Sequence, residues 1–251
     1  HFEVLVIENN STDEATFEYY KTIRRKYRGC RVVGYTGPFN FSAINNFGRK
    51  VARGEYLLLL NNDVEVIDGC WLREMLSLAV QPGVGIVGAK LYYPDNTVQH
   101  GGVIVGLGGY AGHSHKYARR DSSGYMFRLS TVQDLSAVTA ACLLCKASVY
   151  DEVNGLDEAF TVAYNDVDFC LRVRDKGYRI LYSPYAQRYH HESKSRGLDT
   201  KGPAKERFDK EKERMAQRYG ASLTKDPYYN PNLTLDREDF SESDVLPQET
   251  A

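Results

Sequence analysis

The sequence predicts an α/β fold in which a mostly parallel central sheet is flanked by helices. Strand-like and helix-like segments alternate through the first 63 residues, and such alternation is typical of parallel strands joined by right-handed crossovers. Short apolar runs at residues 56–60 and 137–146 have the length and composition of strands buried on both faces of a sheet. The 251 residues, 42% of them hydrophobic, suffice for one large domain or two small ones.

The remaining elements follow from apolar spacing and from turn residues. Strands are expected at residues 2–7, 32–33, 56–60, 84–88, 137–146 and 178–182, and helices after Ser11, after Ser42, at 71–79, from Asn165 and at 203–219. Ser11 with Glu14 forms a capping box, and Ser42 is the expected cap of the second helix. The glycine-rich stretch 101–112 does not lead into a capped helix, so it predicts a hairpin or flap rather than a phosphate loop.

The composition changes after residue 197. A charged helix at 203–219 is followed by acids, turn formers and three prolines, which predict an extended or disordered tail. We therefore divide the chain into a domain at residues 1–197 and a C-terminal helix and tail at 198–251.

Composition also excludes some classes of function. The net charge of −1 gives no sign of a nucleic-acid surface, and no apolar run approaches the roughly 20 residues of a membrane helix. Five scattered cysteines indicate reduced thiols and a cytoplasmic location. Cys142 and Cys145 have C-x-x-C spacing but lie in an apolar run, so a buried strand is favoured over a redox or zinc site.

Polar clusters follow two of the expected strands. Glu8-Asn9-Asn10 comes after the first, and Asn61-Asn62-Asp63 comes after the strand at 56–60. The carboxyl ends of parallel strands share one edge of a sheet, where open α/β folds bind ligands. A carboxylate backed by amide oxygens suits a hard divalent cation and a phosphate that it bridges. An ordinary Asn-Asp turn is the alternative.

Three further groups are candidates for chemistry. Asp166 and Asp168 lie in an expected first helical turn, where acids also favour the helix dipole and where Asp168 can pair with Arg172. Histidines 100, 113 and 115 flank the glycine-rich stretch, and substrate contact and plain surface are equally favoured for them. His190 and His191 precede a Ser/Lys/Arg cluster that suits an anion or a metal.

The order of these motifs resembles that of the family-two glycosyltransferases, whose nucleotide-diphosphosugar fold is called GT-A. The resemblance rests on Glu8 to Asp13, Asn45 to Gly48, Gly54 to Asp63, Gly155 to Glu158, Asn165 to Asp168 and His190 to Gly197, and it covers about residues 2–197. The chain is most similar to bacterial members that build O-antigen, rhamnan and related surface polysaccharides.

The resemblance implies a role for each matching residue. Asp166 corresponds to the general base of an inverting transfer, and Glu8 to the acid that hydrogen-bonds the nucleotide base. Asp63 corresponds to the last acid of the metal motif, which holds Mg²⁺ or Mn²⁺, and His190 or His191 to a histidine that completes the metal site. The other expected substrate or nucleotide contacts are Asn10, Asn61, Asn62, His100, Asp168 and Arg196.

The expected function is thus transfer of a sugar from a nucleotide-diphosphosugar, with UDP- or dTDP-sugars favoured, to a saccharide that can be lipid-linked. The resemblance leaves a peripheral association with the membrane open. Relatives begin with one more strand and helix, so we expect a fragment that lacks one wall of the cleft. The alternatives are a non-catalytic sugar-nucleotide-binding module of a larger protein and, less favoured, a nucleotidyltransferase.

Overall fold

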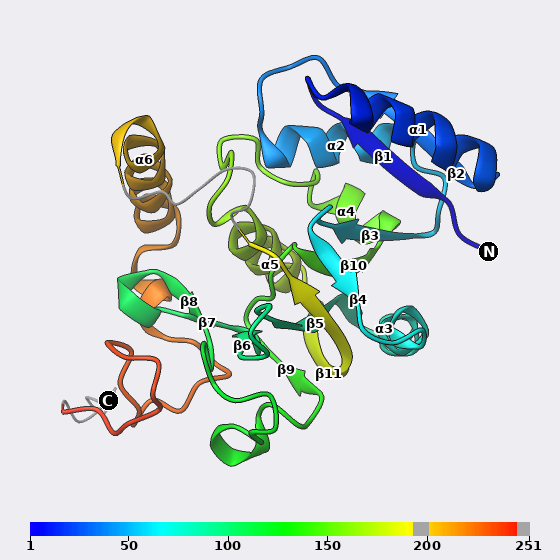
Figure 1. The fold of residues 1–251 in the computed structure, drawn as a ribbon. Helices are drawn as coiled ribbons and strands as arrows, with labels where there is room; N and C mark the ends of the chain where they lie inside the picture. Colours follow the sequence, from blue (N-terminus) through cyan, green and yellow to red (C-terminus); the bar gives the residue numbers. More distant parts are fainter. Residues whose placement is uncertain (193–200, 245–251) are drawn as a thin grey trace.

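A seven-stranded sheet forms the centre of the protein (Figure 1). The computed structural model describes residues 1–192 and 201–244. The sheet contains β3 (Tyr56–Leu60), β4 (Val64–Val66), β5 (Val84–Tyr92), β6 (Val98–His100), β9 (Gln133–Asp134), β10 (Cys142–Lys146) and β11 (Arg179–His190). The strand order is β3-β10-β5-β11-β4, with β6 paired to β5 and β9 paired to β11.

Two small sheets accompany the central one. β1 (Val4–Glu8) and β2 (Cys30–Gly34) pair in parallel, from Val4 opposite Cys30 to Glu8 opposite Gly34. β7 (Val103–Val105) and β8 (Ala111–His113) form an antiparallel hairpin. This hairpin confirms the interpretation of the glycine-rich stretch.

The α/β class is confirmed, but the central sheet is mixed rather than mostly parallel. Within it β5 and β11 pair in parallel, whereas β10 runs antiparallel to both β3 and β5. The alternation of strands and helices in residues 1–63 predicts parallel pairing correctly for β1 and β2, but not for β3, which joins the central sheet and pairs antiparallel with β10. It carries no information on the direction of β10, which enters the sheet after a long excursion.

The helices are α1 (Glu14–Lys26), α2 (Phe41–Val51), α3 (Trp71–Ala79), α4 (Ala147–Glu152), α5 (Asn165–Asp175) and α6 (Gly202–Tyr219), and single 3-10 turns lie at Leu107–Gly109, Tyr125–Phe127 and Gly220–Thr224. Figure 1 shows α1 and α2 grouped with β1 and β2 at one end of the molecule. α3 packs on one face of the central sheet, and α5 and α6 pack on the other.

Strand β10 shows how the sheet is buried on both faces. Leu143 and Cys145 join the core cluster that includes α5, whereas Cys142 and Leu144 join the cluster that includes α3. The alternation follows from the two-residue period of a strand. Burial raises the pKa of both thiols to about 12, so the C-x-x-C pair is part of a buried strand, as predicted.

Strand β3 is less buried than the sequence predicts because it lies at the edge of this sheet. Leu57 and Leu59 are buried, but Leu60 is 45% exposed. The free edge of β3 faces the large cleft described below.

The caps of two helices differ from the predictions. Asp13, not Ser11, caps α1 by accepting the N–H of Ala15. Asn40, not Ser42, caps α2, and the buried Ser42 hydroxyl donates instead to the carbonyl of Phe160. In both places a neighbouring Asp or Asn competes successfully as a cap.

The prediction of an extended or disordered tail is wrong for residues 226–244. Tyr229, Leu233 and Phe240 form a buried cluster with Ile104 and Leu107 of the hairpin region. The carboxylate of Asp226 also accepts the Val105 N–H and the Ser136 hydroxyl. Widely spaced apolar residues are therefore enough to fix this segment.

None of the helices in the described parts of the chain is long and apolar enough to cross a bilayer.

Candidate functional site

A cleft of about 2360 Å³ runs along the free edges of β1 and β3 and past their carboxyl ends. Its walls also receive residues from β8, from the start of α5 and from the end of β11. Of the predicted site residues, the following line it: Asn61, Asn62, Asp63, Asp166 and His190. Sequence positions more than 100 residues apart thus meet in one cleft, as the motif order implies.

Backbone hydrogen bonds hold the polar cluster after β3. The N–H of Asn61 donates to the carbonyl of Ala141, and the N–H of Val64 closes a turn on the Asn61 carbonyl. The carbonyl of Asp63 accepts the N–H of His191. The predicted Asn-Asp turn is therefore present, and it carries the Asp63 side chain to the cleft.

The side chain of His190 meets that of Asp63. Its Nε2 lies 3.2 Å from Asp63 Oδ1. Within residues 1–192 and 201–244, Asp63 Oδ1 is buried and has no hydrogen-bond donor. Burial lowers the pKa of His190, and the Asp63 carboxylate opposes that effect only in part. The ring is therefore neutral at neutral pH.

Gln99 determines which nitrogen of His190 carries the proton. Its side-chain N–H groups donate to the His190 carbonyl and to the Glu192 carboxylate, which turns Oε1 toward His190 Nδ1 at 2.7 Å. An amide oxygen only accepts, so Nδ1 is the donor. Nε2 of the neutral ring then has a lone pair, to which the Asn61 amide donates at 3.3 Å.

Asp63 Oδ1 and His190 Nε2 thus face each other as two electron-pair donors, and a cation bound between them would take the Nε2 lone pair from the Asn61 amide. A carboxylate oxygen and an imidazole nitrogen bound to one small divalent cation are roughly 3 Å apart, close to the 3.2 Å between Asp63 Oδ1 and His190 Nε2. No cluster of three or more His, Cys, Asp or Glu side chains suited to a metal occurs in the described parts of the chain. Asp63 and His190 therefore fit a cation whose other ligands come from water or substrate.

Asp166 lines the same cleft from the first turn of α5. Its Oδ2 accepts the N–H of Ala140 at 3.1 Å, and its Oδ1 accepts the N–H of Val167 at 2.9 Å. Because the carbonyl of the next residue, Ala141, accepts the N–H of Asn61, the short backbone segment 140–141 holds both Asp166 and Asn61 in place. The helix begins after Tyr164, which has a positive φ of 59°.

Asp168 does not line the cleft, which corrects its prediction as a nucleotide contact. Its carboxylate is fully buried and pairs with Arg172 at 2.8 Å and with Arg218, while the Tyr219 hydroxyl donates to it at 2.7 Å. This network joins α5 to α6. Asp168 therefore stabilises the helix that carries Asp166 rather than binding a ligand.

Three other predicted residues lie off the cleft surface. Glu8 accepts the Ser11 N–H at 2.6 Å, Asn10 donates to the Gly37 carbonyl, and His100 is fully buried. Their neighbours Asn9, Ser11 and His113 do line the cleft. The motifs therefore identify the correct segments, but not in each case the side chain that reaches the cleft.

His191 and Arg196 complete the predicted set. The ring of His191 turns toward Glu65, with Nε2 3.0 Å from its carboxylate, so His190 is the histidine beside Asp63. Arg196 lies outside the described residues.

One supporting residue escapes the sequence analysis altogether. Glu211 of α6 is buried, and its carboxylate accepts the N–H groups of Thr161, Val162 and Ala163. These residues form the loop that leads into α5 and line the cleft. In the sequence Glu211 is one of many charges on a charged helix.

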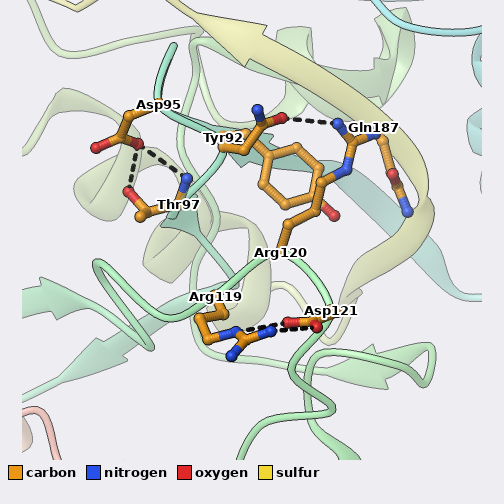
Figure 2. A pocket seen from close by; sticks show the side chains of 8 residues that line it. Tyr92, Asp95, Thr97, Arg119, Arg120, Asp121 and Gln187 are labelled. Carbon is orange, nitrogen blue, oxygen red and sulfur yellow. Dashed lines mark hydrogen bonds and ion pairs between the residues drawn. The ribbon is translucent and has the colours of Figure 1, made fainter.

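A second, smaller hollow of about 580 Å³ is shown in Figure 2. Its charged side chains already have partners: Arg119 pairs with Asp121 at 2.7 Å, Arg120 donates to the hydroxyl of Tyr189 at 2.7 Å, and Asp95 accepts from Thr97. Because these hydrogen bonds already engage the charged groups, the large cleft is the better candidate for a ligand site.

Comparison with known proteins identifies the family of the chain. Residues 1–132 match the family model for glycosyl transferase family 2. The chain is 48% identical to the uncharacterized protein y4gI of Sinorhizobium fredii and 40% identical to the O-antigen biosynthesis protein RfbC of Myxococcus xanthus. These matches cover 96% and 95% of this chain but 26% and 18% of the relatives, so the chain spans about a quarter or less of their length.

The fold has a counterpart among solved structures. The crystal structure of GalNAc-T7 with UDP, GalNAc and Mn²⁺ matches with a TM-score of 0.67 and 12% identity, over 88% of this chain and 43% of that one. This likeness confirms the predicted GT-A fold. Since the family model covers more than half of the sequence, the chain belongs to glycosyl transferase family 2.

Proposed function

We propose that this chain is the catalytic domain of an inverting glycosyltransferase that moves a sugar from a nucleotide-diphosphosugar to a saccharide acceptor. The observation that carries the proposal is the placement of Asp63 and His190 in the same cleft as Asp166. A cation that stabilises the leaving group and a carboxylate base that takes up the acceptor proton both promote a single displacement at an anomeric carbon. Similarity to RfbC supports the same function, and the likeness to GalNAc-T7 supports the fold on which it rests.

Asp166 is the proposed general base. As the acceptor oxygen forms its bond to the anomeric carbon, the bond from that carbon to the diphosphate oxygen breaks. The hydroxyl proton passes to Asp166, and the nucleoside diphosphate leaves. The hydrogen bonds from Ala140 and Val167 fix the orientation of the carboxylate, which is the contribution of geometry to such a step.

Asp63 and His190 would hold Mg²⁺ or Mn²⁺. When bound, the cation neutralises charge on the leaving diphosphate. The orphaned Oδ1 of Asp63 and the lone pair that Gln99 directs toward it support this assignment. Asn61 and Asn62 line the same edge of the cleft and are proposed contacts of the nucleotide diphosphate.

The proposed donor is a UDP- or dTDP-sugar, and the proposed acceptor is a saccharide that is lipid-linked during assembly of a surface polysaccharide. RfbC, named for O-antigen biosynthesis, and GalNAc-T7, solved with UDP, support these classes. Such an acceptor places the reaction at the inner face of the cell membrane, by peripheral association. Glu8 does not itself line the cleft, but it ends the strand β1, whose residues Val4 to Ile7 do, and it stays the proposed partner of the nucleotide base.

The test compares Asp166→Asn with Asp175→Asn, since Asp175 is an exposed carboxylate at the other end of α5. Release of nucleoside diphosphate from UDP-, dTDP- and GDP-sugars is measured with Mn²⁺ and synthetic lipid-linked saccharides. We expect Asp166→Asn to lose at least 100-fold in turnover, about the contribution of a general base, while Asp175→Asn keeps full activity. Unchanged turnover in Asp166→Asn would remove Asp166 as the base. Nucleotide binding without any transfer by the wild type would indicate a non-catalytic module.

A further inference from the structure

Two histidines pair at the wall of the cleft beside Asp166. His113, at the end of β8, lines the cleft, and His100 lies fully buried next to it. Their Nδ1 atoms are 3.0 Å apart, and their rings meet edge to face at 77°. Two ring nitrogens at this distance form a hydrogen bond only if one carries a proton and the other a lone pair.

The buried ring settles which one donates. His100 Nε2 accepts the N–H of Thr139 at 3.4 Å, so this nitrogen has the lone pair. Burial lowers the pKa of both rings, and each is therefore neutral at neutral pH. The proton of neutral His100 then lies on Nδ1, which donates to Nδ1 of His113.

The hydrogen bond from His100 fixes the position of the proton on His113. Because His113 accepts at Nδ1, its own proton lies on Nε2. Among the hydrogen bonds in the described parts of the chain, none has this Nε2–H as its donor, although the charge of Asp166 acts to raise the pKa of His113. The cleft therefore contains an N–H donor with a fixed tautomer and no protein acceptor.

We propose that His113 donates its Nε2–H to a hydroxyl oxygen of the carbohydrate bound beside Asp166, and that His100 is the positioning residue that fixes its tautomer. The inference rests on the proposed function and adds a substrate contact to it. A neutral donor suits a hydroxyl oxygen, whereas a diphosphate favours cations. The oxygen belongs to the donor sugar or to the acceptor, and the experiment below separates the two.

The test compares His113→Met with His113→Gln. The two side chains are similar in length, but glutamine keeps an N–H donor at its end and methionine does not. We expect His113→Met to lose about tenfold in kcat/KM and His113→Gln to stay within about threefold of the wild type, as for loss of one hydrogen bond. Equal losses in the two variants would overturn the proposal.

Binding measurements identify the source of the hydroxyl. Affinities of UDP, UDP-glucose, dTDP and dTDP-rhamnose are measured with Mn²⁺ for the wild type and both variants. If His113→Met binds the nucleotide-sugars more weakly than the wild type but binds UDP and dTDP equally well, the hydroxyl belongs to the donor sugar. If instead only the KM for the lipid-linked saccharide rises, the hydroxyl belongs to the acceptor. If no nucleotide binds the wild type, the proposed function itself fails. If nucleotides bind and both variants behave as the wild type, only the role of His113 fails.

A second readout does not depend on a folded variant. ¹⁵N spectra of histidine-labelled wild-type protein distinguish protonated from unprotonated ring nitrogens. The expected pattern is a protonated Nδ1 in His100 and a protonated Nε2 in His113. A protonated Nδ1 in His113 would refute the tautomer on which the contact depends.

Discussion

Replacing Glu211 with glutamine tests how α6 supports residues 161–163, the loop that leads into α5. Glu211 Oε1 accepts from the Thr161 N–H at 2.6 Å, the Thr161 hydroxyl at 2.7 Å and the Val162 N–H at 2.9 Å. Oε2 accepts from the Ala163 N–H at 3.0 Å. In Glu211→Gln one oxygen still accepts, but its bonds lose their charge, and the new NH₂ group opposes the N–H of Ala163.

The size of the effect follows from these contacts. Hydrogen bonds to a charged group contribute about 1.5–3 kcal/mol each, and an unsatisfied buried donor costs about 1–3 kcal/mol. Glu211 is 3% exposed, so water cannot replace the lost acceptor. Since the amide retains part of the first set of bonds, we expect a loss of about 3 kcal/mol in the free energy of unfolding, or roughly 6–12 °C in Tm for a chain of this size.

The assay is urea and thermal unfolding of Glu211→Gln beside Glu213→Gln, whose carboxylate lies on the exposed side of the same helix. The control should unfold with the wild type. Turnover should also fall in Glu211→Gln, because the loop it anchors leads directly to Asp166. Identical unfolding midpoints in the two variants would refute the structural role assigned to Glu211.

Two further predictions concern buried charges. Asp168→Asn should lower the free energy of unfolding by about 3 kcal/mol, since Arg172 and Arg218 lose their buried partner. The affinity for nucleotides should stay unchanged. A variant that keeps its stability but loses nucleotide affinity would restore Asp168 as a ligand contact. Lys90 is buried with its ammonium on the Leu129 carbonyl, and burial lowers its pKa to about 8. An unfolded lysine has a pKa of about 10.4. Between about pH 8 and that value the unfolded state binds more protons than the folded state, so the free energy of unfolding rises with pH. Between pH 8 and about 10, the urea midpoint of the wild type should therefore rise relative to that of Lys90→Met. If the midpoints of the two proteins change with pH in the same way, the lowered pKa of Lys90 is contradicted.

The first-turn acids of α5 show what sequence alone could and could not decide. The motif identifies Asp166 and Asp168 together. Residues two apart on a helix point about 200° away from each other, so only one of them can face the cleft. The structure gives that place to Asp166 and buries Asp168 against α6. Helical geometry could have separated the two acids, but not without knowing which face is buried.

The adjacent histidines depend on where β11 ends. The sequence predicts that the strand stops before Pro184, but it continues to His190 because the pairing with β5 shifts register between Ser183 and Gln187. Such an irregularity accommodates a proline within a strand. Along the continued strand, Arg188 and His190 share the buried side and Tyr189 does not. The period of two therefore selects His190 once the full strand is known.

Other parts of the site leave little trace in the sequence. Gln99 and His190 are 91 positions apart, and Glu211 and Thr161 are 50 apart. A lone glutamine in a short strand and one acid on a charged helix are common features. Their roles arise only from tertiary packing, which brings a single acceptor against a particular donor.

The central claim is that Asp63 and His190 hold a cation that binds the diphosphate of the donor. The most direct measurement is calorimetric titration of UDP and dTDP, with and without Mn²⁺, into the wild type, Asp63→Asn and the control Asp121→Asn, whose carboxylate pairs with Arg119 outside the cleft. We expect Mn²⁺ to strengthen nucleotide binding at least tenfold in the wild type and the control, but not in Asp63→Asn. An undiminished Mn²⁺ effect in Asp63→Asn, or binding that ignores the cation in the wild type, would contradict the account.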